Sequence, residues 1–357
     1  KDPIWQSSFK RVFSSFGHPS DFALYIIIVF FPFISFVHCD GRCNKRRGFL
    51  YLFIVALALF GLFLAKSRGA ILGLVIGISF YSLLSGIFLK KKWAFYVAAI
   101  LPVITVLMII LLNIFSGASL IKNNYFLRRA IFQGEELRSI ETRLAIWKGG
   151  LEMIEDKLFF GRGLETFPLA FSKYAGPKIK ELESTNSLPD KAHNSFIETA
   201  ANTGLVGLMF YLFAIFSVFK LALGVVGRAV RAKKIEIIGI LSSFVAFLTA
   251  NMFGFSTTVH LVITAFLLAN LSFLLSGKSA TKIIRVGRLG KVFAISMVAI
   301  FVVLNITFQN IFYLWADNYA LKGLKALKED KANEVVKNLS YANLLQPNQS
   351  YYNYLLA

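Results

Sequence analysis

The sequence predicts an all-α protein that crosses a membrane several times as a bundle of helices. Of its 357 residues, 56% are hydrophobic and only 16% are charged, and the mean hydropathy is +0.64. Soluble domains carry roughly 25% charged residues. The chain lacks the polar side chains that would cover a water-facing surface, so lipid must form part of its surroundings.

Eight apolar runs are long enough to cross about 30 Å of hydrocarbon as helices. We expect spans at residues 22–37, 48–65, 69–89, 93–115, 205–226, 235–253, 258–275 and 292–313.

The basic residues of the short loops predict which side each loop faces. Every second loop is rich in them: Arg42, Lys45, Arg46, Arg47, Lys90, Lys91, Lys92, Arg228, Arg231, Lys233, Lys234, Lys278, Lys282, Arg285, Arg288 and Lys291. The alternate loops hold only Lys66 and Arg68. Basic loops face the cytoplasm, so most of the net charge of +20 is explained by the orientation of the chain in the membrane. The charge therefore gives little support to nucleic-acid binding.

This orientation divides the chain into five parts. They are an outside segment at 1–21, spans at 22–115, a long outside loop at 116–203, spans at 204–313 and an outside tail at 314–357. An outside first segment predicts further spans before residue 1. Loops longer than about 15 residues without structure are uncommon unless they have a function, so 116–203 is the first place to look for a site.

The long loop contains one predicted amphipathic helix, at 139–158. Its apolar residues recur at steps of three and four and form one stripe: Ile140, Leu144, Trp147, Leu151, Ile154 and Leu158. We expect this helix to lie on the membrane surface or to pack on the bundle. Glycine and proline then signal turns, until Asn194 or Ser195 caps a helix that runs through Gly204 and Gly207 into the fifth span.

Three residues on the outer side have complementary chemistry. Arg68 lies in a tight outside turn, Arg143 lies beside the apolar stripe, and His193 lies at a helix start. Either arginine could simply reach the lipid headgroups. Two guanidiniums can also clamp a diphosphate, and a histidine can take a proton from a hydroxyl. Together the three suit displacement of a lipid diphosphate by an alcohol.

Other polar residues give weaker signals. His38, Cys39 and Cys43 could form a metal site, but the usual four-ligand spacing is missing, and we interpret them as loop residues. His260 could line the same cavity, although a structural role is the stronger interpretation, and His18 is typical of a turn. The sequence contains no Walker loop, dinucleotide fingerprint, serine nucleophile elbow or HExxH motif, so we expect neither a nucleotide nor a metal cofactor.

Four features together resemble the O-antigen ligase and O-antigen polymerase superfamily of bacterial envelopes. They are residues 16–19 (FGHP), 67–70 (SRGA), 143–147 (RLAIW) with 158–163 (LFFGRG), and His193-Asn194 followed nine residues later by GLVG at 204–207. The resemblance covers roughly residues 10–275.

The resemblance implies a GT-C-type glycosyltransferase in the bacterial inner membrane, with its active site on the periplasmic side. The donor would be a glycan on polyprenyl (undecaprenyl) diphosphate, and the ligase acceptor is a sugar hydroxyl of lipid A–core in lipopolysaccharide biosynthesis. The reaction needs neither metal nor ATP. By motif, Arg68 and Arg143 would bind the diphosphate and His193 would be the general base.

The tail at 316–349 resembles one tetratricopeptide (TPR) unit. Tyr319, Gly323, Ala326, Ala342 and Pro347 fall near the usual positions. A single repeat cannot bury its own face, so we expect further repeats or docking on the long loop. Such tails indicate a protein partner outside the membrane.

Three alternatives to a ligase stay open. A polymerase that joins lipid-linked repeats and a protein O-oligosaccharyltransferase belong to the same superfamily and differ in the acceptor. A transporter of lipid-linked glycans would need polar residues at the middle of the membrane. The centres of the predicted spans are nearly free of charge, which disfavours the transporter.

Overall fold

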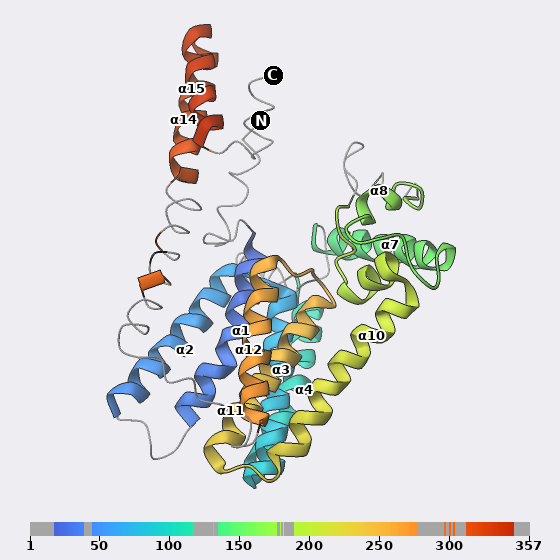
Figure 1. Cartoon of the computed structure of the whole chain (residues 1–357), viewed down its shortest axis with the longest axis vertical. Coiled ribbons are helices and arrows are strands. Elements are labelled where there is room, and N and C mark those ends of the chain that lie inside the picture. The colour runs from blue at the N-terminus through green and yellow to red at the C-terminus, as the bar shows by residue number, and fades with distance from the viewer. Residues whose placement is uncertain are drawn as a thin grey trace. The chain divides into compact units, whose positions relative to one another are not determined.

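The computed structural model describes residues 18–38, 45–117, 131, 135–176, 179, 181, 189–276, 296–297, 300, 303 and 312–345. Within these residues the regular structure is helical and contains no strand. The helices are α1 (Pro19–His38), α2 (Lys45–Ala65), α3 (Arg68–Leu89), α4 (Lys92–Ile114), α7 (Glu135–Asp156), α8 (Phe167–Phe171), α10 (Ser195–Val226), α11 (Arg231–Asn251), α12 (Thr258–Leu275), α14 (Phe312–Lys328) and α15 (Ala332–Leu345) (Figure 1). The backbone divides into two compact units, Lys1–Ser279 and Ala280–Ala357.

Seven of the described helices are long and apolar enough to cross a membrane: α1, α2, α3, α4, α10, α11 and α12. They coincide with the first seven predicted spans to within a few residues, apart from α10, which begins ten residues before the predicted span. The multi-pass, all-helical prediction is therefore confirmed for this part of the chain. Most of the predicted eighth span, 292–313, lies outside the described residues, as do Cys39 and Cys43.

Glycines and small side chains let α3 lie close to α1 and α11. A Cβ atom at Gly73 would be only 2.7 Å from the carbonyl oxygen of Ala246, so nothing larger than glycine fits there. Two buried serines also join α1 to α11: Ser35 donates to the Ile235 carbonyl at 3.1 Å, and Ser243 donates to an α1 carbonyl. These three helices form the main core of the bundle.

The helices of the bundle alternate in direction. Gly61, near the end of α2, lies against Phe22, near the start of α1, and Gly69, near the start of α3, lies against Phe253, just after α11. We call this end of the bundle the α7 end, because α7, α8 and the first turns of α10 gather there (Figure 1). All three predicted site residues belong to segments at this end.

A second core joins α7 to α8 and α10. It contains Ile146, Met153, Ile154, Phe167, Phe171, Ile179, Ala192, Ala200 and Ala201. The predicted stripe of α7 is only partly this buried face: Ile154 is buried, but Leu144 and Leu151 are about half exposed, and the fully buried residues are Ile146 and Met153. The half-exposed residues of the stripe remain open to the predicted contact with the membrane surface, whereas the buried face includes Gly149 and Gly150, against which Phe171 and Ile197 lie.

In the second unit, α14 and α15 pack side by side as a helical hairpin (Figure 1). Its core contains Ala316, Ala320, Leu339 and Ala342. A Cβ atom at Gly323 would approach the Leu339 side chain to 2.9 Å, which explains the glycine. The match to a TPR unit stays a prediction, and Pro347 lies outside the described residues.

Candidate functional site

Arg68 is the first residue of α3, directly after a tight turn from α2. Lys66 closes that turn with a left-handed φ of +51°, and Ser67 is buried. Arg68 itself is partly exposed. The turn therefore holds one guanidinium group at the α7 end of the bundle, at a helix N-terminus, where an anion is favoured.

Two aromatic residues between α11 and α12 connect this turn to the long loop. A Cβ atom at Gly69, the neighbour of Arg68, would lie 3.5 Å from the Cβ of Phe253. The Phe253 ring lies 6.2 Å from the Trp147 ring, and the Phe255 ring lies 5.4 Å from the His193 ring. The segment that contains Phe253 and Phe255 thus contacts the surroundings of all three predicted site residues.

His193 has an unusual backbone conformation at the start of α10. Its φ is +51°, a region in which histidine is found more often than most residues but which is rare in general. Hydrogen bonds fix both neighbours: the Ala192 N–H donates to Glu198 at 3.2 Å, and Asn194 Oδ1 accepts from the N–H groups of Phe196 and Ile197. Asn194 is therefore the helix cap, one of the two predicted candidates.

Arg143 lies on the face of α7 that looks toward His193. Trp147, one helical turn later, donates its indole N–H to the carbonyl oxygen of Ala192 at 3.1 Å. The bond places α7 next to the residue before His193. The Arg143 guanidinium is near enough to act electrostatically on the imidazole.

Burial is the main cause of a lowered pKa for His193, and the positive charge of Arg143 lowers that pKa further. Asp190 opposes the shift, and His18 at the start of α1 adds to it. The imidazole is therefore neutral at neutral pH. A neutral imidazole can accept a proton.

The structure thus brings Arg143 and His193 into electrostatic contact and connects Arg68 to them through Gly69, Phe253 and Trp147. The arrangement offers one proton acceptor and two fixed positive charges near the boundary of an apolar bundle. The roles assigned to the three residues stay predictions.

Sequence reasoning missed the supporting residues. Phe253 and Phe255 stand in a short loop without charge, which gave no signal beyond their aromatic character. The Lys191 ammonium makes ion pairs with Glu165 and Glu198, 3.3 Å to the latter, and so fixes the segment before His193. Of these, only Glu198 has a local pattern, as an acidic residue in the first turn of α10.

Two of the sequence motifs meet at a break within α10. Gly204 has φ +71° and ψ −175°, which are not helical values. The N–H groups of Leu205 and Val206 donate to the carbonyls of Leu158 and Phe159 at 2.7 and 3.3 Å. The turn after α7 therefore supplies acceptors to the N-terminus of the membrane-spanning part of α10.

The same turn also bonds to the part of α10 before the break. Arg162 N–H donates to Ala201 O at 3.1 Å, and Gly163 N–H donates to Asn202 O at 2.8 Å. A Cβ atom on Gly161 or on Gly204 would overlap the opposing backbone. The two glycine motifs are thus complementary halves of one joint.

The remaining histidines have structural contacts. Thr257 N–H donates to His260 Nδ1 at 3.1 Å, which leaves Nε2 to donate to the Asp21 carbonyl at 2.8 Å. His260 therefore joins α12 to α1, and its predicted structural role is confirmed. His38 contacts Tyr81 at 2.8 Å and Lys91 at 2.7 Å, near the opposite end of α1.

A cavity of about 440 Å³ lies beside α7 but contains none of the predicted site residues. Its polar lining includes Glu141, Lys148, Glu152 and Tyr174. The candidate site lies elsewhere, where the bond from Trp147 to Ala192 brings α7 next to His193.

This part of the chain matches a known protein family. Residues 53–212 match the O-antigen ligase family. The match confirms the resemblance to the O-antigen ligase and polymerase superfamily. It includes Arg68, Arg143, His193 and both glycine motifs of the α10 joint, and it excludes the tail. No curated protein matches the chain.

Proposed function

We propose that the chain is an O-antigen ligase-type glycosyltransferase with a GT-C-type fold in the bacterial inner membrane. It transfers a glycan from polyprenyl diphosphate to a sugar hydroxyl of lipid A–core, on the periplasmic side. One observation carries the proposal: His193 has a lowered pKa beside Arg143 at a helix start, inside the segment that matches the ligase family.

In this proposal Arg68 and Arg143 bind the donor diphosphate. Guanidinium groups form two parallel hydrogen bonds to phosphate oxygens and keep their charge at every relevant pH. Negative charge grows on the diphosphate as it leaves the sugar, so fixed cations stabilise the transition state more than the bound donor.

His193 acts as the general base. The acceptor hydroxyl passes its proton to the imidazole as its oxygen forms a bond to the anomeric carbon, and the bond from that carbon to the diphosphate breaks. The lowered pKa keeps the imidazole unprotonated, while the backbone bonds around Ala192 and Asn194 hold it in place.

The test is glycan transfer by purified variants in lipid nanodiscs. His193→Ala, Arg68→Ala and Arg143→Ala should each abolish transfer, since each loss costs roughly 3 kcal/mol or more in the transition state, about a hundredfold in rate. Arg138→Ala is the matched control, because Arg138 is an exposed arginine on the same helix. Near-normal turnover by the three variants would rule out the proposed roles.

The acceptor is tested separately with lipid A–core, a second lipid-linked repeat and a pilin-like protein. Glycosylation of lipid A–core supports the ligase. Extension of the lipid-linked repeat would instead indicate a polymerase, and modification of the protein would indicate an O-oligosaccharyltransferase. Movement of the lipid-linked glycan across liposomes, with no bond made or broken, would indicate a transporter.

A further inference from the structure

The turn after α7 contains two adjacent phenylalanines whose side chains are exposed. The side chains of Phe159 and Phe160 are 64% and 80% exposed, and that of Leu164 is 77% exposed. Large apolar side chains exposed together mark a contact surface. Neither the donor site nor the acceptor base of the proposed function uses this turn.

The turn lies beside the point at which α10 becomes a membrane span. Leu205 and Val206, the first residues after the break, donate their N–H groups to Leu158 and Phe159. From there to Val226, α10 is apolar and largely exposed along its sides. The apolar tip, by which we mean the exposed side chains of Phe159, Phe160 and Leu164, thus lies next to the exposed apolar surface of this span.

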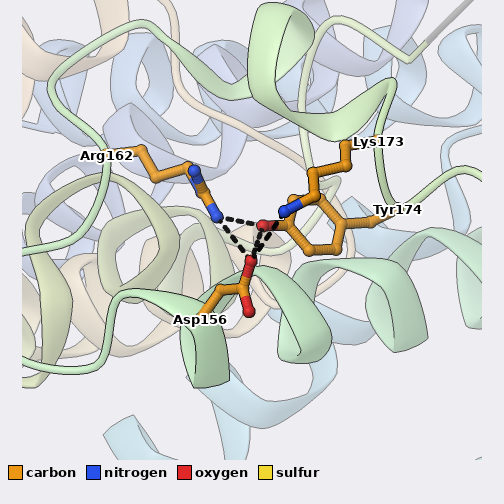
Figure 2. A network of polar contacts seen from close by, with 4 residues as sticks. All are labelled: Asp156, Arg162, Lys173 and Tyr174. Carbon is orange, nitrogen blue, oxygen red and sulfur yellow. Dashed lines mark hydrogen bonds and ion pairs between the residues drawn. The ribbon is translucent and has the colours of Figure 1, made fainter.

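A polar network holds the turn against α8. One carboxylate oxygen of Asp156 accepts from Arg162 at 2.9 Å, from Lys173 at 3.3 Å and from the Tyr174 hydroxyl (Figure 2). Gly161 N–H also donates to Lys157 O at 3.0 Å and closes the turn. The two phenylalanines therefore project from a fixed support.

Basic side chains accompany the apolar tip. Lys157 lies in the turn itself and is exposed, and the Lys173 side chain of the network is 72% exposed. Lysines that flank exposed aromatic residues are typical of segments at a membrane interface, where ammonium groups meet lipid phosphates and rings enter the acyl region.

We propose that the Phe159–Phe160 turn inserts into the lipid leaflet at the α7 end of the bundle. Phospholipid acyl chains surround the two rings, and Lys157 and Lys173 lie among the phosphates. Insertion fixes the height of α7 above the membrane. This proposal does not depend on the proposed function, since it concerns only where the turn lies.

Site-directed spin labelling tests the insertion. In a background with Cys39→Ser and Cys43→Ser, the label is placed by Phe160→Cys or by Leu169→Cys, and the full chain is reconstituted in nanodiscs of phosphatidylethanolamine and phosphatidylglycerol. Leu169 is also 80% exposed, but it belongs to α8, which Figure 1 draws on the side of α7 away from the long part of α10. The two sites are therefore matched in exposure and differ in position.

The Phe160 label should collide readily with dissolved oxygen and several-fold less often than the Leu169 label with a water-soluble nickel chelate. Equal access of the chelate to both labels would overturn the proposal. Protection of the Phe160 label from both reagents would also overturn it, since a protein partner would then cover the turn. If Phe160→Cys does not fold, Leu164→Cys carries the label, with the same outcomes deciding.

Discussion

The indole nitrogen of Trp147 lies 3.1 Å from the carbonyl oxygen of Ala192, to which it donates a hydrogen bond. This bond joins α7 to the residue before His193. Arg143 precedes Trp147 by one helical turn. The bond therefore fixes the position of α7, and with it Arg143, relative to His193. This contact adds to the core that already joins α7 to α10 and lies next to His193.

Trp147→Phe should slow glycan transfer without preventing membrane insertion. The variant keeps an aromatic ring beside Phe253 but leaves the Ala192 carbonyl without its donor, a loss of about 1 kcal/mol, or about fivefold in rate if it falls on positioning. Transfer assays measure the effect. Trp315→Phe, in the tail unit, is the control and should be neutral; equal rates for both variants would contradict the positioning role.

Burial and the charge of Arg143 lower the pKa of His193 below 6.5, the ordinary value for histidine. The rate of transfer should therefore stay high as the pH falls to 6.5 and should decline only at lower pH. Arg143→Gln removes a positive charge from the imidazole, so the pKa of His193 should rise and the acid limb should move to higher pH. The pH profile of the residual rate measures this shift.

A second readout does not need activity. The ¹³C chemical shifts of labelled histidine, assigned with His193→Gln, report the same titration directly. Arg138→Gln is the control on the same helix and should leave the titration unchanged. An unmoved midpoint in Arg143→Gln would show that the two groups are not coupled.

Gly204→Ala should strongly destabilise the protein. Alanine cannot adopt the backbone angles of Gly204, and its Cβ atom would overlap the carbonyl of Phe159; we expect a loss of at least about 3 kcal/mol. Thermal unfolding in detergent measures it. Gly224→Ala, on the same helix with open space around it, should change stability by no more than about 1 kcal/mol; similar melting of the two variants would argue against the joint.

Asn194→Ala removes the cap of α10 and should lower stability by about 1 kcal/mol. Asn194→Ser should restore most of this loss, since serine also caps helices. The two variants are compared by thermal unfolding and by transfer rate. If serine restores neither, the amide has a further role beside His193.

The bundle was predictable because its signals are local. Apolar runs and basic loops gave the first seven spans, since length and hydropathy decide membrane insertion. The cap at Asn194 follows from a short-range pattern as well, whereas the bond from His260 to Asp21 joins residues 239 positions apart. The buried face of α7 did not follow from such a pattern, because Gly149 and Gly150 acquire their importance only from Phe171 and Ile197.

The candidate site was predictable only in part. Arg143 and His193 stand in recognisable motifs, and the charge of Arg143 lowers the pKa of His193, but a common role for the two stays a prediction. Phe253 and Phe255 do not stand in a recognisable motif, because an uncharged loop with two phenylalanines is ordinary in an apolar sequence. Their importance comes from packing against Trp147 and His193, which belong to distant segments of the chain that no local pattern connects to them.

The joint at Gly204 is built almost wholly from main-chain atoms. Carbonyls and amides of 158–163 meet those of 201–206, Gly161 and Gly204 have no room for a Cβ atom, and Gly163 has a φ of +109° that favours glycine. Most of the other residues of this joint could therefore be exchanged without changing the angle between the two parts of α10. The direction of the first part of α10, which follows His193, is thus set independently of the surface chemistry around it.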